Sequence, residues 1–584
     1  MVPSSQTPTI YWRSRILYVV LALFGAIFFL RLGYIQILQN KHYQVIAQEE
    51  HEKKFAVPSE RGEIYLKDGD KQVPLVLNET VFTVFADPRF IENVDSTAAS
   101  IAEVIGGNIS DYKAKLSDKD TAYTVLGRRI SREKALILEE KQLKGVGLQE
   151  GSQRVYPEGN LANQILGFVN DEGNGQYGIE EYLNTELKGK DGLLKAITDV
   201  RGVPLPTGED NIVRPPEKGA DIILTIDRNI QRAVQDALKK GVENSKGDSG
   251  SAIVMDPNTG AIKAMANYPD YEPAKYGDVP QDKYSVFQNA TVNESYEAGS
   301  VVKVFTMASG LNERAVTKDM TYYDSGSVEV DGWKIENAGG SGGKTRTMLD
   351  VISHSVNTGV VFVLKQLGGG EINEKSRNIL YDYFTRKFGL GSNTGIEQAD
   401  EDPGVINGPN TGEGDNIRYA NMTFGQGMRT TMVQMAAAFS SLINGGTYYK
   451  PYLVESKTIN DKTNYIEPQS LRPDLISADA QNQLKDMMRE VMVVGGGYKA
   501  RRAGYILGGK TGTAQIPDEN GQYTKKEEIG SFIGYGAGKT PQYVIMTRVN
   551  KPKIAGYAGT EAASPIFADI SDYLIGYYKI APVE

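Results

Sequence analysis

The sequence of 584 residues contains no cysteine and only three histidines, His42, His51 and His354. The absence of cysteine excludes disulfide scaffolds, cysteine nucleophiles and thiolate zinc sites, and three scattered histidines are too few for a histidine metal cluster. We therefore expect no metal or other cofactor. Any catalysis must run mainly on Ser, Thr, Lys, Asp, Glu or Tyr side chains.

An excess of positive charge is also missing. The chain has 64 Lys and Arg against 73 Asp and Glu, a formal net charge of −9. A protein that follows nucleic-acid phosphates would carry a basic face, so no nucleic-acid partner is expected. At roughly 100–200 residues per domain, the length predicts two to four domains with cores of their own.

One long apolar run stands near the start of the chain. Residues 16–30 carry no charge, and apolar residues continue past Arg31 to Leu38. As one helix at ~1.5 Å per residue, residues 16–38 would cross a hydrocarbon layer of ~30 Å, with Arg31 reaching the far surface. The sequence predicts an uncleaved, single-pass membrane anchor.

Two alternatives to the anchor remain, a cleaved secretory signal and a buried core helix. The signal is disfavoured because no small-x-small cleavage triplet follows Leu30. Arg13 and Arg15 precede the run and no acidic residue occurs before Glu49. Positive residues stay on the cytoplasmic side, so we expect residues 1–15 to form a cytoplasmic tail and the rest to lie outside the cytoplasm.

Beyond the anchor the pattern indicates two further domains. Residues 39–216 alternate short strands and helices in an irregular α+β pedestal, closed by a linker rich in proline near residues 204–216. Residues 217–584 predict an α/β sandwich. The pedestal should contain strands at 81–85 and 123–126 and helices at 131–142 and 179–187. The sandwich should contain strands at 221–226, 531–535 and 542–549, a hairpin at 252–265, and helices at 228–241 and 564–577.

The pattern Ser-x-x-Lys occurs four times, at Ser110, Ser131, Ser300 and Ser341. On a helix this spacing places hydroxyl and ammonium on one face, so a lysine kept neutral by a dry site could accept the serine proton. Three copies lie in polar or glycine-rich surroundings. Only Ser300 is followed by an apolar stretch that would bury its lysine, Lys303, and lower the lysine pKa. Taken alone, an N-cap serine with a surface lysine is the simpler interpretation.

Two later motifs change that balance. Ser355-Val-Asn357 lies 55 residues after Ser300, and Lys510-Thr511-Gly512-Thr513 a further 155 residues on. Each motif is weak separately. In this order, Ser-x-x-Lys, Ser-x-Asn and Lys-Thr-Gly form the signature of acyl-serine, penicillin-recognising enzymes.

With this trio the sequence resembles the class B penicillin-binding proteins, membrane-anchored D,D-transpeptidases of peptidoglycan synthesis. The likeness covers almost the whole chain and includes pedestal segments at residues 61–64, 154–159 and 175–180, the approach to the nucleophile at 295–300, and loops at 425–427 and 444–446. The sequence departs from the family at residues 65–69 and at Ala298, where proline is usual. The resemblance implies a pedestal of the dimerisation type at 39–216 and a transpeptidase domain of the penicillin-binding and serine β-lactamase fold at 217–584.

The resemblance also implies a role for each motif residue. Ser300 would be the nucleophile and Lys303 its base, while Ser355 and Lys510 would return a proton to the leaving D-alanine. Asn357 would hold Lys303 and the substrate amide. Thr511, Gly512 and Thr513 would bind the substrate, with backbone N–H groups of Ser300 and Thr513 as the oxyanion hole.

The partners implied by the family are peptidoglycan stem peptides ending in D-Ala-D-Ala, β-lactams that mimic them, the membrane, and a polytopic glycosyltransferase. A role in septal synthesis is favoured over side-wall elongation from residues 557–567. Alternatives are a D,D-carboxypeptidase, a β-lactam-sensing receptor, a non-catalytic cell-wall scaffold and a class D-like β-lactamase. A Ser-His-Asp site using His354 is disfavoured, because neighbouring residues on a helix point about 100° apart.

Overall fold

The computed structural model describes residues 9–40, 52–197, 212–412, 414–517, 523–537 and 540–583. Contacts divide the chain into two compact units. The first unit contains residues 1–59 and 190–217, and the second contains residues 60–189 and 218–584. Residues 60–189 of the pedestal therefore pack together with the sandwich.

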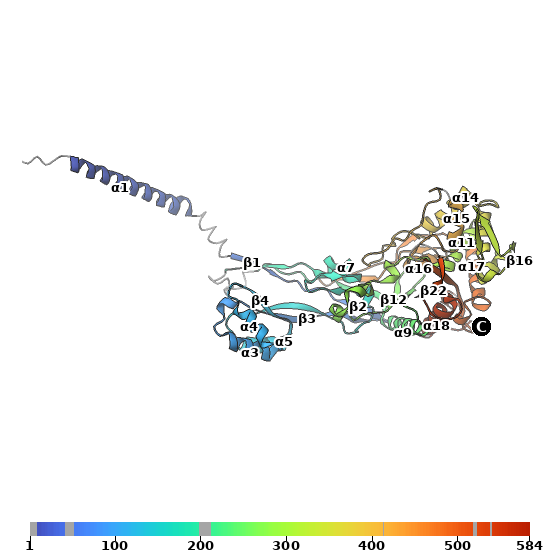
Figure 1. The fold of residues 1–584 in the computed structure, drawn as a ribbon, viewed down its shortest axis with the longest axis horizontal. Coiled ribbons are helices and arrows are strands. Elements are labelled where there is room, and N and C mark those ends of the chain that lie inside the picture. Colours follow the sequence, from blue (N-terminus) through green and yellow to red (C-terminus); the bar gives the residue numbers. More distant parts are fainter. Residues whose placement is uncertain are drawn as a thin grey trace, which may run out of the picture. The chain divides into compact units, whose positions relative to one another are not determined.

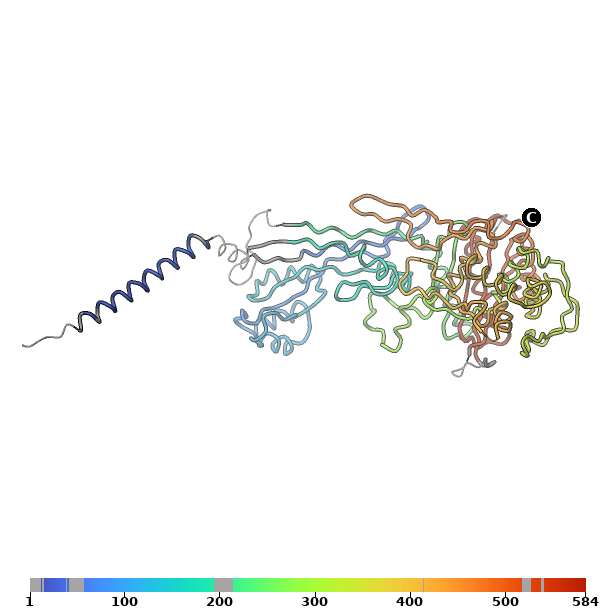
Figure 2. The backbone as a smooth tube through the Cα atoms, turned by 90° about the horizontal axis from the view of Figure 1, so that it is seen from above, coloured from blue at the N-terminus to red at the C-terminus, as the bar shows by residue number. Residues whose placement is uncertain are grey.

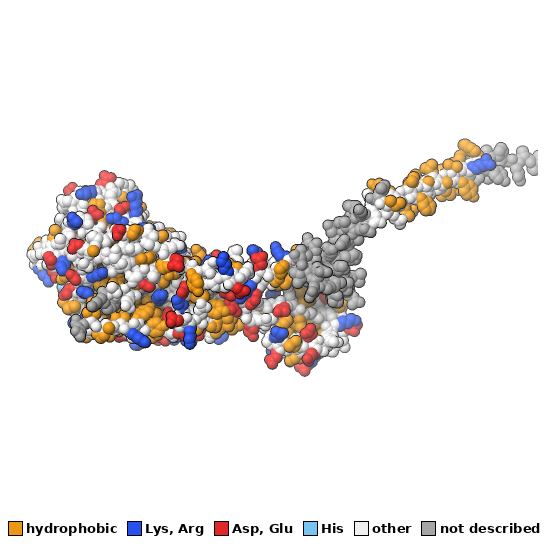
Figure 3. Space-filling view, turned by 180° about the vertical axis from the view of Figure 1, so that it is seen from behind, with side chains coloured by type: hydrophobic (Ala, Val, Ile, Leu, Met, Phe, Trp, Pro, Cys, Tyr) orange, Lys and Arg blue, Asp and Glu red, His pale blue; other side chains and the backbone are white. Residues whose placement is uncertain are grey.

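The first unit contains the long apolar helix. Helix α1 (Thr9–Gly33) continues as one π-helical turn, η1 (Tyr34–Leu38). Residues 15–37 form a candidate membrane span of 23 residues with a mean hydropathy of 2.3 and none of that window buried, one residue earlier at each end than predicted. Figure 3 shows apolar side chains along this helix.

The same unit holds a three-stranded antiparallel sheet in the order β1-β8-β9. Its strands are β1 (Glu52–Val57), β8 (Gly192–Ile197) and β9 (Ile212–Arg214). Strand β9 ends just before Pro215 and Pro216, in the predicted linker. Pro204 and Pro206 of that linker, and residues 1–8 of the predicted tail, lie outside the described residues.

The pedestal part of the second unit is built on a mixed sheet in the order β19-β18-β10-β2-β3-β4, with β5 also paired to β3. Strand β10, which the sequence placed in the sandwich, runs parallel to β2, and β18 pairs with β10 on its other side. Hairpin β18–β19, orange in Figure 2, extends away from the sandwich helices. The strands are β2 (Ile64–Asp68), β3 (Lys71–Ala86), β4 (Thr124–Ser131), β5 (Val146–Val155), β10 (Asp221–Asp227), β18 (Val454–Ile459) and β19 (Lys462–Tyr465).

Three helices, α3 (Val94–Ile105), α4 (Ile109–Ser117) and α5 (Arg132–Glu140), share a small core with β3 and β4. Strands and a helix therefore occur where residues 81–85, 123–126 and 131–142 predicted them. The helix predicted at 179–187 is instead two short helices, because Leu183 leaves the helical conformation with φ −101° and ψ 20°. The short elements that follow β5 are α6 (Asn163–Leu166), β6 (Phe168–Val169), β7 (Gly175–Gln176), α7 (Gly178–Tyr182) and α8 (Asn184–Lys188).

The sandwich is centred on a five-stranded antiparallel sheet in the order β12-β11-β23-β22-β21. Alternate residues of its strands face two cores: on β11, Ala252 and Val254 join α9 and α18, while Ile253 and Met255 face the larger helical core. Helices α9 and α18 lie side by side in Figure 1. The elements are α9 (Arg228–Ser245), β11 (Ser249–Met255), β12 (Ile262–Tyr268), β21 (Ile506–Pro517), β22 (Tyr523–Ala537), β23 (Pro541–Asn550) and α18 (Ser564–Tyr577).

The other face of the sheet is covered by the helices that carry the first two motifs, an arrangement that matches the predicted α/β sandwich. The helices here are α10 (Ala290–Asn293), α11 (Lys303–Asn312), α12 (Met348–Ser353), α13 (Asn357–Leu367), α14 (Glu374–Tyr381), α15 (Asp415–Met422), α16 (Met432–Ser441) and α17 (Ala478–Val493). The short strands are β13 (Thr321–Asp324), β14 (Ser327–Val330), β15 (Trp333–Glu336), β16 (Lys344–Thr347), β17 (Tyr448–Tyr449) and β20 (Ser470–Arg472).

Candidate active site

Ser300 lies in a single 3-10 turn (Gly299–Val302) that leads directly into α11. Gly299 has φ +64°, a left-handed conformation that favours glycine, and a Cβ there would lie 2.9 Å from the carbonyl oxygen of Thr513. Its N–H donates to the Gly425 carbonyl at 3.3 Å. Ala298, where the family resemblance leads us to expect proline, has φ −72°. Proline adopts a φ close to this value, so the turn keeps its direction.

Lys303, the first residue of α11, is fully buried. Its Nζ donates to Ser355 twice, to the carbonyl oxygen at 2.6 Å and to Oγ at 3.1 Å. Burial, and after it the positive charge of Lys510, hold the pKa of Lys303 well below its usual value. A neutral amine at this place can accept a proton.

Ser355 lies between α12 and α13, and Asn357 is the first residue of α13. Ser355 has φ +60°, which turns the chain so that both of its oxygens face Lys303. Asn357 begins α13, and its Nδ2 donates to the Glu336 carbonyl at 2.8 Å. The amide of Asn357 is thus engaged with strand β15, while Ser355 supplies the hydrogen bonds to Lys303.

Lys510, Thr511, Gly512 and Thr513 form the middle of β21, an edge strand of the five-stranded sheet. Gly512 allows β21 to approach the nucleophile turn, since a Cβ there would lie 2.9 Å from the Ala298 carbonyl oxygen. Thr513 Oγ1 accepts from the Gly559 N–H at 3.3 Å. The third motif therefore lies directly against the turn that carries Ser300.

Lys510 is the second fully buried lysine of the site. Its Nζ donates to the Thr511 carbonyl at 2.9 Å. Burial lowers the pKa of Lys510 to about 7, so both charge states of its amine are accessible near neutral pH.

The structure separates the four Ser-x-x-Lys copies. Ser131 caps α5 and accepts from the Lys134 N–H at 3.5 Å, while Lys113 forms an exposed ion pair with Asp95. Lys134 and Lys344 are exposed, and only Lys303 of the four lysines is buried. His354 is exposed and its Nδ1 lies 3.1 Å from Ser353 Oγ.

The sequence did not lead us to a buried arginine, Arg548, which packs on Tyr296 four residues before Ser300. The guanidinium carbon of Arg548 lies 4.7 Å from the centre of the Tyr296 ring, and its Nη2 donates to Glu294 at 2.8 Å. Tyr296 in turn pairs through its backbone with Thr430 at 3.1 and 3.0 Å. A single charged residue inside the apolar strand 543–549 was a usable signal, because Arg is rarely buried without a partner.

The arrangement has parallels in known proteins. The profile of the "Penicillin binding protein transpeptidase domain" matches residues 250–572, and that of the "Penicillin-binding Protein dimerisation domain" matches residues 56–224. The chain is 34% identical over 574 residues to stage V sporulation protein D of Bacillus subtilis, covering 96% of this chain and 85% of that protein. It is 28% identical to a peptidoglycan D,D-transpeptidase FtsI homolog of Mesostigma viride, covering 98% and 97% of the two chains.

A solved structure shares the fold. Penicillin-binding protein 2X of Streptococcus thermophilus superposes with a TM-score of 0.73 at 22% identity, covering 90% of this chain and 80% of that one. The predicted fold class is confirmed: an N-terminal apolar helix, a dimerisation-type pedestal and an α/β sandwich of the penicillin-binding type. The chain belongs to the class B penicillin-binding protein transpeptidases, and the predicted enzyme class, a transpeptidase, is confirmed.

Proposed function

We propose that the chain is a peptidoglycan D,D-transpeptidase that works through an acyl ester on Ser300. The observation that carries the proposal is the buried amine of Lys303, one helical turn after Ser300 and hydrogen-bonded to Ser355. A lysine costs free energy to bury without an ionic partner. An acyl transfer that needs a neutral amine as base explains its presence.

The proposed first half-reaction cleaves the terminal D-Ala-D-Ala bond of a stem peptide. Ser300 Oγ attacks the carbonyl carbon as its proton passes to Lys303 Nζ. The C–N bond then breaks, and the leaving D-alanine amine receives that proton by way of Ser355. Backbone N–H groups of Ser300 and Thr513 would stabilise the oxyanion, each contributing ~3–4 kcal/mol.

Substrate binding is assigned to strand β21, which lies against the turn that carries Ser300. Lys510 in its protonated form, with the hydroxyls of Thr511 and Thr513, suits the terminal carboxylate. Gly512 lets a peptide backbone lie against β21 because no side chain intervenes. Asn357 would orient the substrate amide through its two-sided side chain.

The second half-reaction transfers the acyl group to an amine. An amine from a neighbouring stem attacks the ester carbonyl, the C–O bond to Ser300 breaks, and Ser300 regains its proton. Water in place of the amine would give a D,D-carboxypeptidase. Comparing the products formed with and without an added amine acceptor distinguishes the two reactions.

Acylation by a β-lactam tests the nucleophile. We expect the mass of the intact full-length protein to rise by one β-lactam, and S300A to show no adduct. The matched control is S309A, which removes a hydroxyl two turns further along α11 where Ser309 Oγ donates to the Thr306 carbonyl. An adduct that persists in S300A would remove Ser300 from this role.

The cellular role is proposed as septal cell-wall synthesis, with the catalytic part outside the cytoplasm and a polytopic glycosyltransferase as partner. The relative named for a stage of sporulation, at 34% identity over 96% of this chain, favours a second candidate role in that developmental process. A fluorescent fusion at midcell in dividing cells supports the septal role. A uniform side-wall signal contradicts it and supports elongation, whereas a signal confined to sporulating cells supports the second candidate.

The membrane orientation is proposed from Arg13 and Arg15, which precede the candidate span. An alkaline phosphatase fusion at the C-terminus should be active, since that enzyme requires an oxidising compartment. An inactive fusion together with an active cytoplasmic reporter would reverse the topology.

A further inference from the structure

We propose that Asp324 is a positioning residue for Asn357, acting through Thr358 and Asn337. This inference rests on the proposed function, because it assigns a support to one of that site's residues. Asp324 ends strand β13 and lies 33 residues before Asn357 in the sequence. It does not reach the reacting atoms; it determines where the start of α13 lies.

Asp324 is a fully buried carboxylate at which four donors converge. Its Oδ2 accepts from Arg346 Nε at 2.7 Å. Its Oδ1 accepts from Asn337 Nδ2 at 2.8 Å, from Thr358 Oγ1 at 2.8 Å and from the Gly326 N–H at 3.0 Å. The donors come from β16, from the segment after β15, from α13 and from the turn after β13, so one side chain joins four segments.

The electrostatics support an ionised carboxylate at this place. Burial alone would raise the pKa of Asp324, but the hydrogen bonds from Arg346, Gly326 and Thr358 hold the pKa below its usual value. Arg346 is itself buried, with 5% of its side chain exposed. An amide in place of the carboxylate would therefore leave a buried guanidinium without its counter-ion.

The contacts made through Asp324 lie one residue away from the contact of Asn357. Asn357 Nδ2 donates to the Glu336 carbonyl at 2.8 Å, and the next residues along, Thr358 and Asn337, are joined by the Thr358 N–H to Asn337 Oδ1 at 3.0 Å. Asp324 then binds the side chains of both Thr358 and Asn337. Loss of the hydrogen bonds to Asp324 would weaken the attachment of α13 to residues 336–337, which is where Asn357 is held.

The hairpin β14–β15 has a second attachment that does not involve Asp324. At its tip, Asp331 accepts from Asn416 Nδ2 at 3.3 Å and from the Ile417 N–H at 3.2 Å. The hairpin should therefore stay docked on α15 when Asp324 is changed. We expect a shift at the start of α13 and not the loss of the whole segment.

Two substitutions test the proposal in the full-length protein in detergent. D324N keeps the shape but turns an amide donor toward the donor Arg346. T358V removes the hydroxyl that donates to Asp324 and that also lies 3.0 Å from the Tyr322 hydroxyl. The matched controls are D227N, at the buried N-cap of α9, and T547V, which removes a buried hydroxyl that donates to the Ala563 carbonyl at 2.9 Å. The measurement is stopped-flow acylation by a fluorescent penicillin, which separates the dissociation constant from the first-order acylation rate, with thermal unfolding alongside.

Misplacement of a catalytic group by ~1 Å can cost about 100-fold in rate. We expect D324N to lower the first-order acylation rate by about 10- to 100-fold and T358V by about 3- to 10-fold, with the dissociation constant changed less than about threefold. Both controls should keep the acylation rate within about threefold while lowering the melting temperature. The double variant D324N/T358V should lose less than the product of the two single effects, because the two changes share the contact between Asp324 and Thr358.

The proposal is overturned if D324N and T358V melt at lower temperature but acylate as fast as their controls, since Asp324 would then be structural only. If D324N does not fold, the rate of T358V decides between the two outcomes. Failure of the proposed function is distinguishable, because in that case the unsubstituted protein itself would form no adduct on Ser300.

Discussion

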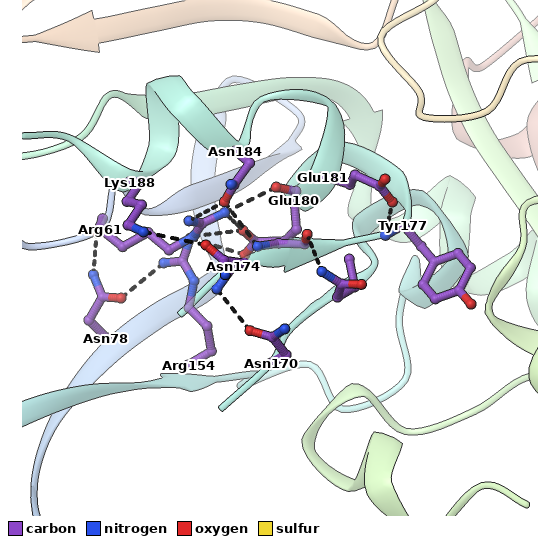
Figure 4. Close-up of polar contacts among 12 residues, drawn as sticks. Arg61, Asn78, Arg154, Asn170, Asn174, Tyr177, Glu180, Glu181, Asn184 and Lys188 are labelled. Carbon is purple, nitrogen blue, oxygen red and sulfur yellow. Dashed lines mark hydrogen bonds and ion pairs between the residues drawn. The ribbon is translucent and has the colours of Figure 1, made fainter. Parts of the chain in front are cut away.

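The Glu180 cluster of the pedestal and the candidate active site of the sandwich bury ionisable groups in opposite ways. In the pedestal, Glu180 is fully buried between two arginines: Arg61 Nε lies 2.8 Å from Oε2 and Arg154 Nη2 lies 3.0 Å from Oε1 (Figure 4). In the sandwich, Lys303 and Lys510 are both fully buried, and within the part of the chain that the structure describes neither forms an ion pair with a carboxylate. The cluster around Glu180 compensates its buried charges, as the pair of Arg346 and Asp324 does in the sandwich, whereas the site brings together two buried amines without a carboxylate.

The difference separates a structural use of buried charge from a chemical one. Two neighbouring guanidinium groups favour the ionised form of Glu180, and the resulting ion pairs hold together the segments that carry the three side chains. Burial without a nearby carboxylate disfavours the charged form of both lysines. The pKa of Lys303 therefore falls far below its usual value, and that of Lys510 falls to about 7. A perturbed pKa of this kind is what a general base requires.

Removing the amine of Lys303 should have the largest effect. K303M keeps the volume of the side chain but removes the proton acceptor, so we expect acylation by a β-lactam to slow about 10³- to 10⁴-fold. The folded state should be at least as stable as before, because a desolvated amine is gone. Acylation kinetics with thermal melting measure both. A rate within tenfold of the unsubstituted protein would contradict the assignment of Lys303 as the base.

Removing the carboxylate of Glu180 should have the opposite effect to K303M: a large loss of stability with little change in the acylation rate. E180A leaves Arg61 and Arg154 buried without a counter-ion, and we expect the unfolding free energy to fall by about 3–5 kcal/mol. The first-order acylation rate of the protein that remains folded should change less than about threefold. Denaturant unfolding and acylation at low temperature measure the two quantities. A large loss of acylation rate with unchanged stability would mean that the pedestal charges act on the chemistry.

Replacing Lys510 should stabilise the protein. The pKa of Lys510 falls from 10.5 to about 7 on folding, so between these values the unfolded chain binds more protons and stability rises with pH. The destabilisation of the folded state by this buried amine is therefore largest below pH 7, and it decreases to nearly zero as the pH approaches 10.5. We expect K510M to gain roughly 2–4 kcal/mol at pH 6 and little at pH 10. Equal effects at the two pH values would show that Lys510 is not desolvated.

The smallest effect is expected at an exposed ion pair. Lys141 and Glu103 lie 2.9 Å apart, with 31% and 70% of their side chains exposed. E103Q should change the unfolding free energy by less than about 0.5 kcal/mol, because water and salt screen such pairs. It is the matched baseline for E180A in the same unfolding measurement. A loss of 2 kcal/mol or more would remove the contrast between buried and exposed charge.

Much of the fold could be predicted because local signals agreed with the tertiary packing. The closing helix occurs at residues 564–577 as predicted, and strand 221–226 extends by one residue. The partner of that strand could not be predicted, because its pairing with β2 joins residues more than 150 positions apart. The break at Leu183 has no glycine or proline beside it, so the pattern predicted one helix instead of two.

Part of the candidate site could likewise be predicted from the sequence, and part of it could not. The apolar residues after Ser300 predicted the burial of Lys303, and the structure shows this burial. The contact of Asn357 with Glu336 and the convergence of four segments at Asp324 could not be predicted. Both depend on the path of residues 321–347, whose short strands and glycine loop carry little periodic pattern.

The most direct measurement is the pH dependence of the first-order acylation rate at saturating β-lactam between pH 5 and pH 10. If the amine of Lys303 is neutral at physiological pH, the rate falls only in acid and is flat above neutrality. A rate that still climbs tenfold per pH unit near pH 10 would mean that Lys303 is protonated at neutral pH, and the account of the site would be wrong.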